Sequence, residues 1–529
     1  MPATLPPSIF NDVVGPIMRG PSSSHSAASV RIGRLLRDLC GGTPQHVRFD
    51  FDTLGSLPTT HDTQGSDMGL FGGLLGLEPD DAQLPQSAEL LRAAGCEVEF
   101  CFAELRDPHP NTYRLCATRD GKTHRMVAVS TGGGMIEVVE LDGAKVSLFG
   151  DYDVTVLDVE TGAADVAAQL VPHVDDVQVA GSMVVAVGQR FVPDEVLAAL
   201  STVRRVRRLA AVLPVRSRRG LTVPFLHAGE LAAHGDLDAL PLSHFALAYE
   251  TARGGIDDAA VLERMRHVRK IGREGVAAGL AGTDYPGRVL PRQSHVFAQR
   301  MAAGTLLESG LLNQAILAVT ALMEVKSSMG VFVAAPTAGS CGTWAGTCHA
   351  AIEQLGCETS GDAMAEERAL RAMLAGGLIG VFVATRSSFA AEVGGCQAET
   401  GAGAAMAAAS LVELAGGSAA QSLSAASHAI QNVLGLICDP VANRVEAPCL
   451  GRNIAGAANA IACANMALSG YDHLVPLDEV LDAHREVSES MARELRCTAL
   501  GGLSITPTSK AIEARLAKEC GGGGCGSCG

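Results

Sequence analysis

The sequence has few aromatic residues, no recognisable secretory signal and no long uninterrupted apolar segment. Aromatic residues make up 4% of the 529 residues, so the chain offers little surface for stacking nucleic-acid bases. The N-terminus lacks a basic segment followed by an apolar one. The most membrane-like segment, residues 374–384, is too short to span a bilayer and predicts a buried helix. We therefore expect a cytoplasmic protein that acts on neither nucleic acid nor membrane.

Positive charge is scarce as well. The chain has 41 Lys and Arg against 57 Asp and Glu, a formal net charge of −16, and such a chain is repelled by phosphate backbones. Hydrophobic residues at 47% and charged residues at 19% exclude disorder. The length predicts two or three domains. The 15 cysteines indicate free thiols or metal ligands rather than a disulfide framework.

The first part of the chain mixes strands and helices. Residues 1–150 contain β-rich segments at 46–56, 96–103 and 124–130 and a helical segment at 26–39, which predicts an α/β or α+β domain.

Residues 151–215 predict a small second domain. Their order of strand, helix, strand, strand, helix and strand is typical of a ferredoxin-like fold. Gly162 lies in the turn between its first strand and first helix, and the basic, loop-like residues 216–225 are the candidate linker.

Helical periodicity dominates after the linker. Val261, Met265, Val268 and Ile271 share one face of a predicted helix, and Ala/Gly-rich apolar segments follow. Residues 226–519 therefore predict an all-α domain, before a flexible Gly/Cys-rich tail at 520–529. The expected fold class is a multidomain α+β protein.

Three cysteines of the helical part have unusual neighbours. Cys396, Cys438 and Cys449 each lie beside Gly or Pro, where the chain leaves regular structure. No CxxC pair occurs among them, so the usual structural zinc signature is absent. Their spacing alone favours three buried thiols without a ligand, because free cysteine is often buried.

Four motifs, taken together, closely resemble the iron–sulfur L-serine dehydratases. They are GPSSSHSAASVRIG, PTAGSCG, VGGCQAETG and CDPVANRVEAPCLGRN. The resemblance is to the branch in which a β-type domain, here 1–150, is followed by an ACT-like module, here 151–215, and it extends in order to an α-type catalytic domain. It implies a lyase that converts L-serine, or a close analogue, to a 2-oxo acid (pyruvate) and ammonia.

The same resemblance implies a [4Fe–4S] cluster held by Cys396, Cys438 and Cys449. Three thiolates leave one iron open, and an open iron can bind the β-hydroxyl as a Lewis acid while a base takes the α-proton. No PLP is then required. Lys326 is the one candidate for a Schiff-base lysine near a Gly-rich turn, and we do not assign it that role.

Hydroxyl-rich turns are the candidate substrate contacts. Ser22, Ser23 and Ser24 precede a predicted helix, whose free N–H groups suit a carboxylate, and His25 would orient it. An ordinary serine N-cap is the alternative. By resemblance, Ser130 of the STGGG turn also lies near the active site. We expect the Thr337 and Ser340 hydroxyls of the PTAGS turn to face the cluster, with Ser340 acting in catalysis and with Thr337 and Asp67 binding the substrate. We do not count Cys341 as a ligand.

One motif departs from the family. The family segment TGKGHGTD corresponds to residues 60–67, and aligning its last residue with Asp67 places Gln64 where the family has histidine. The glutamine amide does not titrate and cannot act as a general base. Three possibilities remain open: His61 takes over, another base acts, or the substrate is not serine.

Other points also stay open. In part of the family a C-terminal cysteine caps the open iron, which makes Cys528 a candidate cap, although a disordered tail is as plausible. Gly162 is slight evidence for a regulatory ligand, and an oligomerisation role suits the module better. We expect a small amino-acid substrate and a homodimer or larger homo-oligomer. The alternative functions are cysteine desulfidation and a non-catalytic iron–sulfur sensor.

Overall fold

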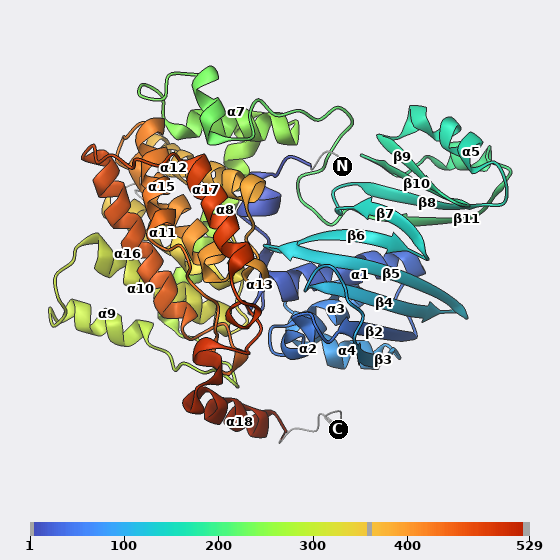
Figure 1. Ribbon diagram of the computed structural model, residues 1–529, viewed down its shortest axis with the longest axis horizontal. Coiled ribbons are helices and arrows are strands. Elements are labelled where there is room, and N and C mark those ends of the chain that lie inside the picture. Colours follow the sequence, from blue (N-terminus) through green and yellow to red (C-terminus); the bar gives the residue numbers. More distant parts are fainter. Residues whose placement is uncertain (1–4, 357–361, 522–529) are drawn as a thin grey trace. The chain divides into compact units, whose positions relative to one another are not determined.

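The computed structural model describes residues 5–356 and 362–521 and divides into two compact units (Figure 1). The division falls after Ser23 and after Thr222. We call residues 24–222 the sheet unit, and residues 5–23 together with 223–521 the helical unit. The predicted mixed α+β, multidomain class is confirmed. Most of the Gly/Cys-rich tail, Cys528 included, lies outside the described residues.

A six-stranded sheet forms the larger part of the sheet unit. Its strand order is β3-β2-β4-β5-β6-β7, and β2 and β3 are its parallel pair while the other neighbours are antiparallel. The strands are β2 (His46–Asp52), β3 (Glu97–Ala103), β4 (Thr112–Arg119), β5 (Lys122–Gly132), β6 (Met135–Leu141) and β7 (Ala144–Leu148). The accompanying helices are α1 (Ala28–Cys40), α2 (Leu57–Thr60), α3 (Ser66–Leu75) and α4 (Ser87–Ala93).

Alternating side chains explain why β2 forms and which face it buries. Val47, Phe49 and Phe51 are fully buried at every second position, as expected for a strand with one face in the core. The helices above them pack closely, because a Cβ at Gly33 of α1 would lie 2.6 Å from the Leu70 carbonyl oxygen of α3. This close approach requires glycine at position 33.

The second sheet of this unit has four antiparallel strands. Its order is β11-β8-β10-β9, and the chain runs β8, α5, β9, β10, α6, β11, in the pattern predicted for residues 151–215. Val154 and Val185 of this sheet belong to the same apolar core as Ile136 of the large sheet, which explains why the two sheets form one unit. The predicted domain boundaries remain predictions. The elements are β8 (Asp153–Val159), α5 (Ala163–Leu170), β9 (Asp176–Ala180), β10 (Met183–Gly188), α6 (Asp194–Ala198) and β11 (Val203–Leu209).

Long helices make up nearly all of the helical unit (Figure 1). The face predicted for residues 261–271 is present in α8, where Val261, Met265 and Val268 are buried and Ile271 is half-buried. The helices are α7 (Leu242–Gly254), α8 (Asp258–Ala281), α9 (Ser294–Ala302), α10 (Leu311–Ser327), α11 (Cys341–Gln354), α12 (Ala363–Arg386), α13 (Ala391–Gly394), α14 (Ala402–Leu414), α15 (Ala419–Gln431), α16 (Cys449–Leu468), α17 (Leu477–Ser490) and α18 (Pro507–Gly521).

The predicted buried helix at residues 374–384 lies in α12. Among the described residues, α12 is the one helix long and apolar enough to cross a membrane, yet 78% of its most apolar window is buried inside the protein. Its small residues receive neighbouring side chains: a Cβ at Gly377 would lie 2.7 Å from Ile9, and one at Gly380 would lie 2.0 Å from Val13.

The N-terminal segment, residues 5–23, therefore packs into the helical unit, although it was predicted to belong to the β-type domain. Its π-helical turn η1 (Ile9–Val13) lies on α12, and β1 (Ile17–Met18) pairs with β12 (Phe332–Val333) in a short antiparallel ladder. The reason is complementary shape, since the apolar side chains of η1 fit over the glycines of α12.

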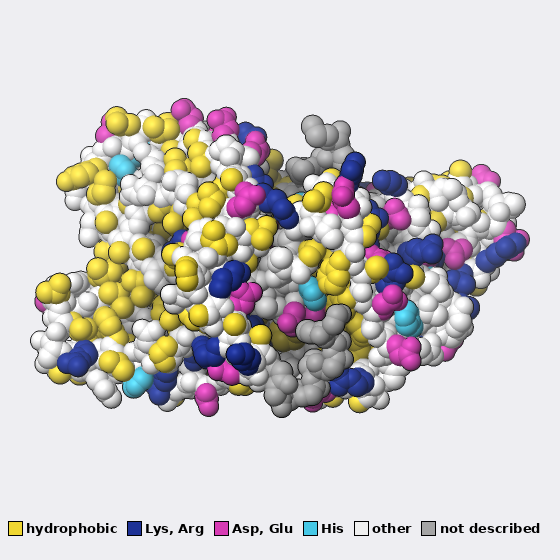
Figure 2. Space-filling model, turned by 60° about the horizontal axis from the view of Figure 1, so that its bottom comes forward, with side chains coloured by type: hydrophobic (Ala, Val, Ile, Leu, Met, Phe, Trp, Pro, Cys, Tyr) yellow, Lys and Arg dark blue, Asp and Glu magenta, His cyan; other side chains and the backbone are white. Residues whose placement is uncertain are grey.

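Several large hydrophobic side chains remain exposed on the helical unit. Leu307, Met364 and Leu474 are each more than 80% exposed, at 88%, 84% and 81%. Figure 2 shows hydrophobic side chains gathered over one end of this unit. An oligomer would cover such residues, but the predicted homo-oligomer stays a prediction.

A buried carboxyl of α7 holds the N-terminal segment in place. Glu250 accepts hydrogen bonds from the Ser8 hydroxyl (2.6 Å) and the Ile9 N–H (2.8 Å). Burial raises the pKa of Glu250 from 4.5 to about 7. The unfolded chain therefore loses this proton at a lower pH than the folded chain does. This group's contribution to stability is complete below pH 4.5 and is lost as pH rises through about 7.

We expect Glu250→Gln to flatten this pH dependence. Between about pH 5 and 8 the wild-type chain should lose up to about 3 kcal/mol more unfolding free energy than the variant, because the variant carries no titrating group there. Thermal unfolding midpoints across that range would measure the difference. Glu274→Gln, at an exposed position of α8, is the control. Parallel pH profiles for wild type and Glu250→Gln would contradict the prediction.

Candidate functional site

The three predicted cluster cysteines are all buried in the helical unit and come from three separate segments. Cys396 follows α13, Cys438 lies in the loop after α15, and Cys449 is the first residue of α16. The backbone at Gly395 allows the chain to turn into Cys396. Gly395 has φ +71°, and a Cβ there would meet the Leu436 carbonyl oxygen at 2.8 Å. Glycine is therefore required immediately before Cys396.

Two of these thiols and a carboxylate lie close enough to bind one metal group. The ligand atoms of Cys396, Cys438 and Glu399 are all within 4.8 Å of one another. Cys449 is outside this tight group. Burial raises the pKa of the Cys449 thiol, and the nearby charge of Cys396 raises it further. The structure thus brings the three cysteines into one buried region, which we call the cysteine site.

A fourth cysteine, Cys497, belongs to the same site and was not predicted from the sequence. Its thiol is hydrogen-bonded to Cys438, which is also hydrogen-bonded to Cys396. Backbone hydrogen bonds fix these loops: the Cys438 N–H donates to the Leu495 carbonyl (2.8 Å) and the Cys497 N–H donates to Ala391 (3.4 Å).

Arg452 supplies positive charge to the cysteine site. Its guanidinium donates to the Cys396 sulfur (3.4 Å) and to the Asp439 carboxylate (2.7 Å). The hydrogen bond from Cys438, with a further contribution from Arg452, lowers the pKa of Cys396 despite its burial. The same hydrogen bond raises the pKa of Cys438. Cys396 is therefore the thiol that ionises first, and a thiolate is the metal-binding form.

Glu399 is the half-buried carboxyl of the site and was not predicted from the sequence. It accepts a hydrogen bond from the Thr337 hydroxyl (2.6 Å), and Thr337 is 3.1 Å from the Ser340 hydroxyl. A Cβ at Gly339 would lie 2.8 Å from the Glu399 carboxylate. Burial, followed by the charge of Cys396, raises the pKa of Glu399 to about 8. Glu399 therefore holds a proton near neutral pH.

Lys326 places a second cation beside these groups. Its side chain is 1% exposed, and its ammonium donates a hydrogen bond to the Val445 carbonyl. Its charge acts to lower the pKa of both Glu399 and Cys449. The ammonium therefore offsets part of the negative charge that ionised thiols would bring to the site.

Asn453 ties the predicted PTAGS turn to the cysteine site. Its amide donates to the carbonyls of Gly339 and Cys449, both at 2.8 Å, and its oxygen accepts from the Thr343 N–H at 3.0 Å. The turn also receives the N-terminal segment, because the Ala338 N–H donates to the Ser23 hydroxyl (3.2 Å). Thr337, Ser340 and Ser23 are thus held in one hydrogen-bonded arrangement with Glu399.

In the sheet unit, His25 is buried and neutral. Its Nε2 lies 2.8 Å from the Thr60 hydroxyl, which donates its own proton to the Ser56 carbonyl. Because a hydroxyl has one proton to donate, His25 must be the donor in the first contact. Burial, with the charge of His61, lowers the pKa of His25 to about 3. The ring can orient a partner but carries no charge near neutral pH.

His61 and Gln64 differ in their surroundings. The His61 Nδ1 lies 2.8 Å from the Asp67 carboxylate, and its ring stacks on Phe100 with centroids 5.1 Å apart. Gln64 is 1% exposed, and its backbone carbonyl accepts a hydrogen bond from the Ser26 hydroxyl (3.1 Å). A carboxylate on Nδ1 is the arrangement that orients a catalytic imidazole.

Ser130 is a predicted residue with a buried hydroxyl. It is fully buried in β5, and its oxygen has no hydrogen-bond partner among the described residues. The following glycines 132–134 have positive φ and form the predicted turn. Ser22 is half-buried, and Ser24 is 5% exposed.

Some residues of the cysteine site that were not predicted lie within the quoted motifs and carried a signal there. Glu399 is a charged residue in an apolar segment, and Arg452 and Asn453 follow Cys449 in the same motif. Because a buried charge usually has a partner, such residues indicate a polar site. Cys497 and Lys326 carry no such local signal. Only long-range packing brings them beside Cys438 and Cys449.

The donor set fits an iron–sulfur group. It offers several buried thiols, of which one has a lowered pKa, and two nearby cations to balance anionic sulfur. The donors Cys396, Cys438 and Cys449 lie in irregular loops and at a helix start, where free backbone N–H groups occur.

Known proteins resemble this chain in sequence. A family model described as the serine dehydratase alpha chain matches residues 181–504. The probable L-serine dehydratase alpha chain of Bacillus subtilis is 37% identical over 256 residues, covering 48% of this chain and 83% of that protein. The probable beta chain of the same organism is 35% identical over 145 residues, 27% of this chain and 64% of the relative.

A single-chain relative matches nearly the whole length. L-serine dehydratase 2 of Escherichia coli is 28% identical over 509 residues, covering 92% of this chain and 96% of that protein. The chain thus combines, in one polypeptide, regions similar to separate alpha and beta chains.

We expect Arg452→Gln to slow alkylation of Cys396 in metal-free protein. Without the guanidinium the pKa of Cys396 rises, and near neutral pH its thiolate fraction falls about tenfold for each unit of that rise. Peptide mass spectrometry after a short iodoacetamide pulse would measure it, and a fall of at least about threefold is expected. Arg485→Gln, on the exposed side of α17, is the control. An unchanged Cys396 rate would show that Arg452 does not stabilise the thiolate.

Proposed function

This chain belongs to the L-serine dehydratase family and is an L-serine ammonia-lyase-like enzyme, and we propose that it uses a [4Fe–4S] cluster held by Cys396, Cys438 and Cys449 to eliminate water from L-serine. The products are pyruvate and ammonia. The observation that carries the proposal is the convergence of these three buried thiols, with Glu399, in the helical unit.

When bound, the cluster would supply a Lewis-acidic iron for the β-hydroxyl, since hydroxide is a poor leaving group. The protein's own residues support that chemistry. Arg452 and Lys326 balance negative charge on sulfur, and Asn453 fixes α16 against the turn that carries Thr337 and Ser340. These two hydroxyls are the proposed substrate contacts nearest to Glu399.

Glu399 is suited to hold a proton beside this site. Its raised pKa of about 8 keeps it protonated near neutral pH, so it can donate a hydrogen bond, or a proton, to a departing oxygen. Ser22, Ser23, Ser24 and Ser130 are proposed to bind the substrate carboxylate, with neutral His25 orienting it.

We assign removal of the α-proton to His61. Asp67 holds its Nδ1, which leaves Nε2 to accept a proton, and Gln64 cannot do so. Three further proposals rest on the same family resemblance: residues 151–215 form an ACT-like module, the protein is a homo-oligomer, and Cys528 caps the open iron.

The proposed cluster makes each ligand necessary. We expect Cys396→Ser, Cys438→Ser and Cys449→Ser each to lower iron and acid-labile sulfide after anaerobic reconstitution, and to lower serine turnover at least about a hundredfold. Cys463→Ser, buried in α16 away from the site and bonded to Asn459, is the matched control. Full iron and sulfide retention in the three variants would exclude these ligands.

Product analysis separates serine from cysteine as substrate. Reconstituted enzyme with L-serine should release pyruvate and ammonia in equal amounts, whereas faster sulfide release from L-cysteine would reverse the assignment. If neither L-serine nor L-cysteine is turned over while an intact cluster responds to oxidants, the sensor alternative would be favoured.

His61→Asn tests the assigned base. Asparagine keeps a hydrogen bond to Asp67 but cannot accept the α-proton, so we expect kcat to fall about 10²–10⁴-fold with unchanged iron content. Loss of deuterium exchange at the serine α-carbon would locate the defect at proton removal. His46→Asn, at an exposed strand position, controls for the loss of an imidazole. Normal kcat in His61→Asn would place the base elsewhere.

A further inference from the structure

Gln397, the residue after Cys396, is fully buried, and both polar atoms of its side-chain amide are hydrogen-bonded. The amide oxygen accepts from the Gly435 N–H (2.7 Å), and the amide nitrogen donates to the Ser488 hydroxyl (2.7 Å) and to the His484 carbonyl (3.3 Å). Because a backbone N–H can only donate, the oxygen must face Gly435, which fixes the orientation of the side chain. Nothing in the proposed reaction uses this amide.

Gln397 ties the turn that carries Cys396 to the loop that carries Cys438 in two places. Its side chain accepts from Gly435, three residues before Cys438, and its backbone N–H donates to the Leu436 carbonyl (2.9 Å). The Cys438 N–H in turn donates to the Leu495 carbonyl (2.8 Å). Residues 435–438 are therefore held at both ends, and Gln397 sets their distance from the Cys396 turn.

Helix α17 gives this amide a fixed support. The Ser488 hydroxyl, which receives the Gln397 amide, donates its own proton to the His484 carbonyl one turn earlier (2.8 Å). Both residues of α17 are buried, and the His484 ring lies 2.7 Å from the Ser387 hydroxyl just after α12. A Cβ at Gly394 would lie 2.6 Å from the Ser488 oxygen, so the end of α13 packs directly against α17.

Gln397 and Arg452 connect the cysteine segments in different ways. Arg452 joins α16 to Asp439 and to Cys396 through its charge. Gln397 carries no charge at any pH, so it acts on the positions of Cys396 and Cys438 without changing the net charge around them. Groups that orient metal ligands typically lower metal affinity about 10–100-fold when they are removed.

We propose that Gln397 is a positioning residue, which holds Cys396 and Cys438 close enough to bind one metal group. The ligand atoms of these two cysteines lie within 4.8 Å of each other, and Gln397 joins the segments that carry them. The iron–sulfur identity of the metal group rests on the proposed function, whereas the spacing of the two thiols does not.

Cobalt binding to the full-length, metal-free protein measures this spacing. Co²⁺ binds thiolates, and its sulfur-to-metal charge-transfer absorption reports the thiolates that it contacts. Gln397→Met keeps the length of the side chain but removes its three hydrogen bonds, so we expect Co²⁺ affinity to fall about 10–100-fold. Gln431→Met is the matched control, because the Gln431 amide also donates to a serine hydroxyl and a backbone carbonyl, those of Ser427 and His473.

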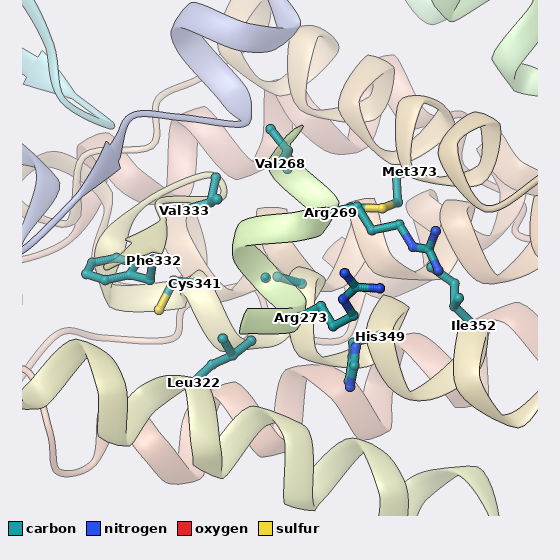
Figure 3. Close-up of a pocket in the computed structure, with 12 residues that line it drawn as sticks. Val268, Arg269, Arg273, Leu322, Phe332, Val333, Cys341, His349, Ile352 and Met373 are labelled. Carbon is teal, nitrogen blue, oxygen red and sulfur yellow. The ribbon is translucent and has the colours of Figure 1, made fainter. Parts of the chain in front are cut away.

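Cys341 is a buried thiol outside the cysteine site and is therefore the control for where Co²⁺ binds. It lines a pocket among α8, α10, α11 and α12 (Figure 3), and its sulfur lies 3.8 Å from the Met323 sulfur. Cys341→Ser should leave Co²⁺ affinity unchanged. A loss of affinity in this variant would place the ion outside the cysteine site and overturn the proposal.

Two further measurements keep the test decisive if Gln397→Met folds poorly. Ser488→Ala leaves Gln397 in place and removes only its partner on α17, so Co²⁺ binding should weaken at least about threefold. In Gln397→Met the Gly435 amide should exchange with deuterium faster than in wild type, because it loses its acceptor. All affinities are compared at a temperature where circular dichroism shows the variants folded. Wild-type affinity in both Gln397→Met and Ser488→Ala would overturn the proposal.

Serine turnover separates this role from the proposed function. If Gln397→Met binds Co²⁺ as tightly as wild type while reconstituted wild-type enzyme turns over serine, the positioning role is wrong and the proposed function stands. If Co²⁺ binding weakens as expected while reconstituted wild-type enzyme is inactive on serine, the positioning role is supported and the proposed function is contradicted.

Discussion

The cysteine site depends on how ionisable groups are buried among apolar helices. An ionised thiol or carboxyl inside a protein is unfavourable unless a partner compensates it. Here Cys396 is compensated by Arg452, whereas desolvation and, after it, the charge of Cys396 raise the pKa of Glu399 and keep it protonated. A group that brings several thiolates together therefore needs the cations that this chain buries, Arg452 and Lys326.

Small residues make that arrangement possible. Gly339 lets the PTAGS turn approach Glu399, and Gly395 lets the chain turn into Cys396 beside Leu436. A side chain at either position would push the turn or the loop away. The glycines of the quoted motifs thus act through close backbone approach, which also explains why the motifs contain so few large residues.

The PTAGS turn is packed against the cysteine site. Its Thr337 hydroxyl donates to Glu399, and Asn453 connects the turn to α16. Packed elements of this kind transmit a displacement as a whole, since they have little free volume in which to deform.

The sequence by itself determined the element types and the family, and it singled out the three cysteines that are proposed as cluster ligands. Strand alternation in β2 and the helical face of α8 are local patterns, and the cysteine motifs are contiguous. It did not determine that residues 5–23 join the helical unit, because the glycines of α12 that receive Ile9 and Val13 lie more than three hundred residues away. The places of Cys497 beside Cys438 and of Lys326 beside Cys449 were likewise decided by tertiary structure alone. These residues lie far apart in the sequence, so no local pattern records their proximity.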